Sequence, residues 1–197
     1  MTKSAHVVGI EEPKDSSRAA PVPGRGAAVD WSGKVYEVLR RVEIRQVAYV
    51  PDAGHARLIN LCHADPAMKT VVLTSEQEGI GVLSGAWLGG ERGVLLMQSS
   101  GIGNCINNFA MVNVCDFPLL MLVTMRGEWG EFNPWQVPMG RTSRASLKLA
   151  GMTVYEVCEA EHAEETVEAA ARIAFNSCQG AAVLFSQRML GTKLFKD

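Results

Sequence analysis

The sequence lacks three features that would assign a chain quickly to a class of protein. It has no basic surplus: 19 lysines and arginines against 21 aspartates and glutamates give a net charge of −2, which argues against nucleic acid as a partner. No apolar run approaches the ~18 residues of a membrane-spanning helix. The N-terminus also lacks the apolar core of a signal peptide. We therefore expect a cytoplasmic protein that binds neither membrane nor nucleic acid.

Cysteine is present, but in no metal-binding or redox pattern. The five residues are scattered and odd in number, and no two of them form a Cys-x-x-Cys pair. We therefore expect free, buried thiols in a reducing compartment rather than disulfides or a metal site. The five are Cys62, Cys105, Cys115, Cys158 and Cys178.

What the chain does have is the composition of one globular domain, with 197 residues of which 47% are hydrophobic and 20% charged. Residues 1–29 are rich in proline, glycine and serine with little apolar periodicity, which predicts a flexible arm before a single domain at 30–197. Short apolar runs alternate with helical patterns, which predicts a three-layer α/β/α sandwich around a mostly parallel sheet of about six strands. The expected strands are 46–50, 71–73, 93–97, 119–124, 152–157 and 180–185.

Residues 71–104 carry the most informative pattern. A helix rich in glycine and alanine is expected from Glu76 to Leu88, and a tight loop, QSSGIGN, is expected at 98–104. Each glycine inside a helix costs about 1 kcal/mol against alanine, so something is expected to approach this helix closely. Its small-residue face would consist of Gly81, Ser84, Gly85 and Leu88, which follow the spacing of one helix face.

Two glutamates fall in the first turn of this helix, where the helix dipole favours a carboxylate. Ser75 is expected to cap the helix, with Glu78 at the capping-box spacing. Both Glu76 and Glu78 could be capping acids. Alternatively, one of them projects from the strand-to-helix junction into a site, because ligands bind at such junctions in parallel α/β sheets.

The order of these elements resembles the pyrimidine-binding domain of thiamine diphosphate enzymes, in particular the sulfopyruvate and phosphonopyruvate decarboxylase group. The shared pattern is a glutamate, a small-residue helix ending in Gly-Ala-Trp, a strand, and then Gln-Ser-Ser-Gly-Ile-Gly-Asn. In that family one glutamate hydrogen-bonds N1′ of the cofactor's aminopyrimidine ring, and the family register places Glu76 there and Glu78 as the cap. The resemblance covers nearly all of residues 31–187.

The resemblance also implies further site residues. The turn after the first expected strand is similar to the family's turn beside the substrate, which makes Asp52 and His55 catalytic candidates together with Glu76. His55 could equally be a solvent-facing loop histidine. Cofactor contacts would be Glu76, Pro51, Ser100, Gly101 and Asn104, and substrate contacts would be Ser99, Ser100, Asn104 and Asn107. The two adjacent serines replace two histidines of the related pyruvate decarboxylases, so proton transfer would need another donor or water.

A long polar and aromatic segment at residues 125–141 is expected to be a functional loop. Arg126 and Arg141 could bind an anionic substrate group, since arginine suits sulfonate and phosphonate oxygens. They could equally form surface ion pairs with Glu128 or Glu131. Three aromatic side chains of the segment could anchor a partner or pack beneath the loop: Trp129, Phe132 and Trp135.

Full-length members of the resembled family carry a second domain that holds the diphosphate through Mg²⁺ and is marked by Gly-Asp-Gly, a motif that this chain lacks. The resemblance therefore implies the α subunit of a two-subunit thiamine diphosphate-dependent 2-keto acid decarboxylase. Its substrate would be a 3-substituted pyruvate such as sulfopyruvate or phosphonopyruvate, and its products CO₂ and an aldehyde. A separate β subunit would hold most of the Mg²⁺ site, in an α2β2 or larger assembly. Two alternatives stay open: a non-catalytic nucleotide-binding or scaffold module, and a thiamine diphosphate carboligase subunit.

Overall fold

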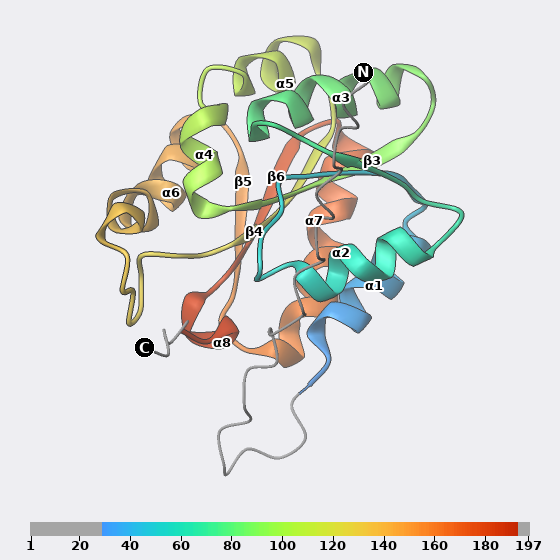
Figure 1. Ribbon diagram of the computed structural model, residues 1–197. Helices are drawn as coiled ribbons and strands as arrows, with labels where there is room; N and C mark the ends of the chain where they lie inside the picture. The colour runs from blue at the N-terminus through green and yellow to red at the C-terminus, as the bar shows by residue number, and fades with distance from the viewer. Residues whose placement is uncertain (1–28, 193–197) are drawn as a thin grey trace, which may run out of the picture.

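A computed structural model describes residues 29–192 of the chain. Six parallel strands form one sheet in the order β2-β1-β3-β4-β6-β5, with helices on both of its faces (Figure 1). The predicted three-layer α/β/α fold is thus confirmed, and the sheet is entirely parallel. The expected N-terminal arm lies almost wholly outside the described residues.

The strands agree best with the sequence prediction where they are most apolar. Every residue of β4 and β6 is buried, and both match the predicted runs residue for residue. The prediction of a buried strand at 71–73 is wrong, because β2 is an edge strand and the side chain of Val72 is 59% exposed. The six strands are β1 (Ile44–Tyr49), β2 (Lys69–Val72), β3 (Arg92–Gln98), β4 (Leu119–Thr124), β5 (Thr153–Val157) and β6 (Gly180–Phe185).

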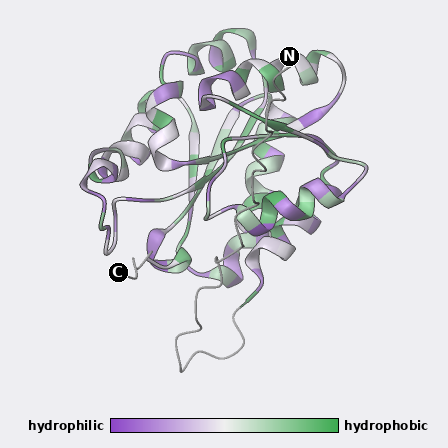
Figure 2. Ribbon diagram, viewed as in Figure 1, coloured by the Kyte–Doolittle hydropathy of each residue, from purple (hydrophilic) through white to green (hydrophobic). Residues whose placement is uncertain are grey.

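Two hydrophobic cores lie on opposite faces of the sheet. Alternate residues of β3 separate them: Val94 and Leu96 face one core, while Leu95 and Met97 face the other. Helices α1 (Trp31–Arg41), α2 (Ala56–Ala64) and α7 (Ala163–Ser177) pack in the first core. The second core contains α3 (Glu76–Leu88), α4 (Ser99–Cys105), α5 (Phe109–Cys115) and α6 (Val137–Leu149). The central strands are accordingly the most hydrophobic part of the ribbon (Figure 2).

Helices α1 and α3 begin in different ways. Asp30 caps α1, because its carboxylate accepts a hydrogen bond of 3.0 Å from the backbone N–H of Gly33. The predicted cap of α3 is wrong, since the side chain of Ser75 makes no capping hydrogen bond. The exposed Glu78 instead accepts from the backbone N–H of Thr74 at 3.0 Å. Glu78 therefore accepts from the backbone N–H of Thr74, the residue before Ser75, and acts as a capping acid there.

Two segments predicted as loops are partly helical. Helix α4 begins at Ser99, directly after β3, so the prediction of a tight loop at 98–104 is wrong. A second short helix, α5, begins at Phe109. The loop after β4 ends at Asn133, where a 3-10 turn (Pro134–Gln136) leads into α6. The two prolines of this segment lie in first helical turns, where a missing N–H does no harm.

The remaining sequence predictions on cysteine and membranes concern the whole chain. All five cysteines are free, but only Cys62 and Cys105 are buried. The prediction of buried thiols is therefore correct for two of the five cysteines.

Among residues 29–192, no helix combines the length and apolar character that crossing a membrane requires. The last turn of helix, α8 (Gln187–Leu190), follows β6 and closes the described part of the chain.

Candidate active site

The predicted site residues gather at one edge of the sheet, where the carboxyl ends of the parallel strands meet. Asp52 follows β1, Glu76 follows β2, Ser99 follows β3 and Arg126 follows β4. The strand order reverses here, because the chain leaves β1 for β2 on one side and returns to β3 on the other. Such a switch point is the usual ligand position of an open parallel sheet.

Glu76 is a buried carboxylate held between two helices. Glu76 is the first residue of α3 and is 8% exposed. Its Oε2 accepts a hydrogen bond of 2.8 Å from Nδ2 of Asn104 on α4. A Cβ atom on Gly101 would lie 2.4 Å from Cδ of Glu76, so only glycine lets α4 approach this closely. Burial, with a smaller contribution from the Glu76 charge, raises the pKa of the neighbouring Cys105 thiol to about 12. Of the two first-turn glutamates, Glu76 is thus the one that points inward.

Asp52 ties together the ends of three strands. Its Oδ1 accepts from Nε2 of Gln98 at 3.1 Å, and its Oδ2 accepts from Oγ1 of Thr124 at 2.5 Å. Gly54 allows this contact, since a Cβ there would lie 2.7 Å from Cγ2 of Thr124. The carboxylate of Asp52 is therefore fixed across the switch point between β1 and β3.

His55 lies behind Asp52 and is completely buried, so the alternative of a solvent-facing histidine is wrong. Neither ring nitrogen forms a hydrogen bond, and Nδ1 lies 3.7 Å from Oδ2 of Asp52. Trp31 and Phe185 meet the imidazole ring edge to face. Burial lowers the pKa of His55 to about 4, against the opposing effect of the Asp52 charge. The imidazole is accordingly neutral at pH 7.

The serines after β3 have different roles. The buried Ser99 hydroxyl accepts from the backbone N–H of Arg126 at 3.0 Å and lies 3.4 Å from its carbonyl oxygen, to which it donates. Ser99 therefore fastens β3 to the end of β4. The hydroxyl of Ser100 donates to Oε1 of Gln98 at 3.1 Å and so helps to orient the amide that holds Asp52.

Arg126 is paired within the chain. Its Nε and Nη2 donate to the two carboxylate oxygens of Glu131 at 2.6 and 2.5 Å, which selects Glu131 over Glu128 as its ion-pair partner. Glu131 also accepts from the backbone N–H groups of Gly127 and Asn133. These donors, with Arg126 first, lower the pKa of Glu131 to about 2. The hydrogen bonds and charge of Glu131, with a smaller contribution from the Asp52 charge, raise the pKa of Arg126.

Gln187 is a site residue that sequence reasoning missed. Its side chain is buried, Nε2 donates to Glu131 at 2.9 Å, and Oε1 accepts from the backbone N–H groups of Glu128 and Trp129. Gln187 thus fastens the loop after β4 to the end of β6. A lone glutamine near the end of a chain has no periodicity or motif that would reveal such a contact.

Other predicted residues lie at the margin of this cluster. Among residues 29–192, no hydrogen bond or ion pair joins Asn107 or Arg141 to it, and both are exposed. Pro51 is also exposed and lines a hollow of about 410 Å³ beside Asp52. The three aromatic side chains of the 125–141 segment are exposed rather than packed beneath it, at 54%, 46% and 85% for Trp129, Phe132 and Trp135.

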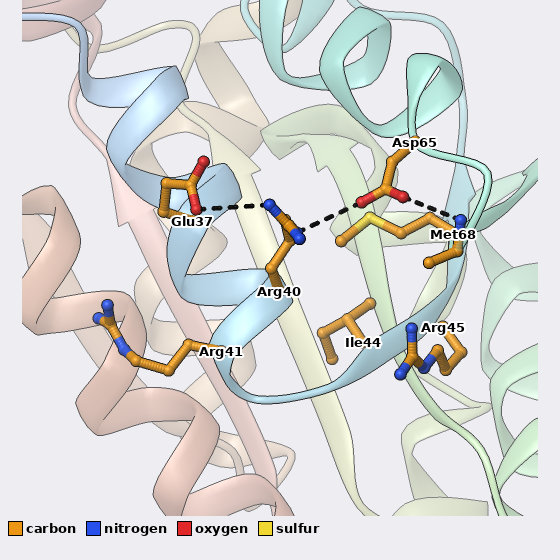
Figure 3. A pocket seen from close by; sticks show the side chains of 8 residues that line it. Glu37, Arg40, Arg41, Ile44, Arg45, Asp65 and Met68 are labelled. Carbon is orange, nitrogen blue, oxygen red and sulfur yellow. Dashed lines mark hydrogen bonds and ion pairs between the residues drawn. The ribbon is translucent and has the colours of Figure 1, made fainter.

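A second hollow, of about 450 Å³, lies at the opposite edge of the sheet (Figure 3). Arg40 stands there between Glu37 and Asp65, at 3.9 and 3.6 Å. Arg41 is turned toward α7, where it pairs with Glu168 at 2.9 Å. The switch-point edge remains the candidate site, because the predicted site residues gather there around the buried carboxylate of Glu76. Within the part of the chain that the structure describes, no three His, Cys, Asp or Glu side chains are grouped to hold a metal ion.

Comparisons with known proteins identify relatives of the chain. The chain is 33% identical over 157 residues to sulfopyruvate decarboxylase subunit alpha of Methanothermobacter thermautotrophicus, covering 79% of this chain and 95% of that one. It is 35% identical to sulfopyruvate decarboxylase of Methanosarcina acetivorans, over 65% of this chain and 33% of that longer one. Phosphonopyruvate decarboxylase of Streptomyces viridochromogenes is 36% identical, over 55% of this chain and 28% of its own length.

A solved structure of 2-oxoglutarate:ferredoxin oxidoreductase from Magnetococcus marinus has a similar fold. Its TM-score is 0.63 at 12% identity, over 81% of this chain and 29% of that one. No protein-family model matches the chain. The sequence identity therefore carries the assignment, because it extends over nearly the full length of the archaeal subunit. The chain belongs to the family of sulfopyruvate decarboxylase α subunits.

Proposed function

We propose that this chain is the α subunit of a thiamine diphosphate-dependent carboxy-lyase. It would release CO₂ and an aldehyde from a 3-substituted pyruvate such as sulfopyruvate or phosphonopyruvate. The names of the relatives support the reaction. The observation that carries the proposal is the buried Glu76, which the fold holds at the switch-point edge beside Asn104 and Gly101.

The residues around Glu76 fit the aminopyrimidine half of thiamine diphosphate. Oε2 of Glu76 accepts a hydrogen bond from Asn104, while Oε1 accepts none from any residue in 29–192. A carboxyl group with one committed and one available oxygen is suited to bind a ring nitrogen. Gly101 leaves the backbone of α4 close to that carboxyl group, and we assign Pro51, Ser100, Gly101 and Asn104 as further cofactor contacts. When bound, the cofactor supplies a carbanion-stabilising thiazolium.

The substrate end of the site would be built around Asp52. Gln98 and Thr124 orient its carboxylate, and Ser100 orients Gln98, so this group can hold or move a proton at a fixed position. Arg126, a further proposed substrate contact, follows β4 at the same edge and is paired there with Glu131. Ser99, Asn104, Asn107 and Arg141 are further proposed substrate contacts.

A partner subunit would complete the site. Relatives named as alpha subunits imply such a partner, and the chain matches only a third of the longer decarboxylase from Methanosarcina acetivorans. We assign the diphosphate and Mg²⁺ to this β subunit, because the described residues contain no group of metal ligands. We propose an α2β2 or larger assembly, which the family resemblance implies, and a cytoplasmic location, which the scattered cysteines predict.

The test begins with the tagged chain recovered from its own cells together with any stoichiometric partner. Bound thiamine diphosphate is measured, and CO₂ and aldehyde are assayed with sulfopyruvate, phosphonopyruvate and pyruvate. Glu76→Gln should lower kcat by on the order of 100-fold or more, while fold and assembly stay intact. The matched control is Glu78→Gln, which changes the capping acid two residues away and should keep parental activity.

The outcomes of these assays distinguish the decarboxylase from its two alternatives. Full activity of Glu76→Gln would remove Glu76 from the mechanism. A homo-oligomer without partner or cofactor would contradict the decarboxylase and support a non-catalytic binding module. Formation of a coupled product from added aldehyde, in preference to simple release, would instead identify a carboligase.

A further inference from the structure

His55 is a buried polar side chain whose two ring nitrogens make no hydrogen bond. Most buried polar atoms in proteins have a partner, and leaving one without a partner destabilises the fold. The imidazole ring packs against the aromatic rings of Trp31 and Phe185. A phenylalanine could make the same contacts without burying an unpaired nitrogen, so packing alone does not explain a histidine here. The position thus holds a residue that stability alone would not favour.

Asp52 is the charged group that faces this imidazole. Nδ1 of His55 lies 3.7 Å from Oδ2 of Asp52, which already accepts from Thr124. A carboxylate oxygen has a second lone pair, and a shortening of roughly 0.8 Å would bring Nδ1 to ordinary hydrogen-bond length. Contacts of this kind are often long in empty active sites and tighten when a ligand binds.

We infer that His55 is a positioning residue that acts through Asp52, donating from Nδ1–H to Oδ2 when the site fills and so holding the carboxylate in one orientation. The inference rests on the proposed function, in which Asp52 faces the substrate. No proton leaves His55, since the neutral ring keeps its proton on Nδ1 throughout. The donor becomes important when a substrate group competes for Gln98 or Thr124, the two donors that hold Asp52 otherwise.

Substituting His55 by asparagine or by glutamine tests which ring nitrogen is needed. The amide of asparagine can occupy the position of Nδ1, whereas that of glutamine reaches the position of Nε2. In the complex with its partner, His55→Phe and His55→Gln should each lower kcat by about 10- to 100-fold, because the carboxylate is no longer fixed. His55→Asn should recover most of kcat. His162→Phe, at an exposed histidine of the turn before α7, is the matched control and should behave as the parent.

Stability provides the second readout. His55→Phe should unfold at the same or a higher temperature than the parent, because an unpaired imidazole has been replaced by a ring that fits the same aromatic surroundings. Parental kcat in His55→Phe would overturn the inference. Equal losses in the Asn, Gln and Phe variants, with a lower unfolding temperature in each, would overturn it in favour of a purely structural role.

A measurement without catalysis separates this inference from the proposed function. In ¹⁵N-labelled protein at pH 7, the ring of His55 should be neutral and should carry its proton on Nδ1. A proton on Nε2 would overturn the inference whether or not the enzyme is active. If the parent complex decarboxylates none of the keto acids, the proposed function fails. The tautomer and an interaction between His55→Phe and Asp52→Asn in thermal unfolding would still decide whether the two side chains are coupled.

Discussion

Nδ2 of Asn104 lies 2.8 Å from Oε2 of Glu76 and thereby joins α4 to the first turn of α3. The two helices follow different strands, so this hydrogen bond fixes the inward-facing carboxylate from outside its own helix. Among residues 29–192, Oε1 accepts no hydrogen bond and lies beside Gly101 of α4. The bond from Asn104 therefore helps to set the position of the Glu76 carboxylate.

Removing this bond should weaken the site without unfolding the domain. We expect Asn104→Ala to lower kcat by on the order of tenfold or more, because a misplaced reacting group is enough to reduce the rate that strongly. The affinity for thiamine diphosphate, measured by calorimetry on the complex, should fall in parallel. Asn113→Ala on α5, where the amide donates to the carbonyl of Ala150 outside the site, is the control. Equal activity of the two variants would contradict the role of Asn104.

Glycines in this region divide into two kinds. A Cβ on Gly101 would collide with Glu76, whereas nothing in the described structure lies within 4 Å of a Cβ on Gly81. Gly101→Ala should therefore displace Glu76 and abolish most activity. Gly81→Ala should stabilise the isolated chain by up to about 1 kcal/mol through higher helix propensity. Urea unfolding and steady-state kinetics of both variants check the pair, and an active Gly101→Ala enzyme would contradict the close contact.

The buried histidine predicts how stability depends on pH. The pKa of His55 is about 4 in the folded chain, below its ordinary value near 6.5, so the unfolded chain binds the proton more readily. Stability is therefore complete above pH 6.5 and falls as the pH drops toward 4, by on the order of 3 kcal/mol. Urea unfolding between pH 7 and pH 4 measures this loss.

The same measurement on His55→Phe isolates the histidine. That variant should lose the part of the pH dependence that lies between pH 6.5 and 4. Glu131 contributes in a lower window, because its pKa is depressed to about 2 and its stabilisation is lost as the pH falls below its ordinary value near 4.5. Identical pH profiles for the parent and His55→Phe would show that His55 does not titrate as its burial requires.

The carboxylate of Glu131 should matter more for stability than exposed acidic residues do. Glu131→Gln leaves the largely buried guanidinium of Arg126 without its counter-charge, which typically destabilises a protein by about 3 kcal/mol. Glu156→Gln breaks the exposed pair with Arg144 and should change stability by less than about 1 kcal/mol. Thermal unfolding compares the two. Faster proteolysis within the loop after β4 in Glu131→Gln would locate the damage.

The fold was predictable where local pattern and burial agree. The apolar runs at β4 and β6 have the same bounds in sequence and structure, because every residue there faces a core. Helix α3 also has its predicted bounds despite its glycines. The start of α4 was missed, since Ser99, Ser100, Gly101 and Gly103 are weak helix formers. Tertiary contacts decide that segment, including the approach of Gly101 to Glu76.

The site was predictable in its membership but not in its contacts. The family register selected Glu76, Asp52 and Asn104, and the structure places Glu76 against Asn104 at the same edge as Asp52. Their roles stay predictions. Burial of His55 and the links from Gln187 to the loop after β4 depend on residues distant in sequence, so no local pattern reports them.

Gln187 has a consequence for the order in which the protein is made. It follows Glu131 by 56 residues, and β6, which precedes it directly, inserts between β4 and β5. A nascent chain emerges from the ribosome from its N-terminus onward. Glu131 and Arg126 are therefore exposed to solvent well before the glutamine that fastens their loop is synthesised. The β4 side of the candidate site is therefore completed last, when β6 completes the sheet. A prematurely terminated chain would leave this edge of the sheet half assembled.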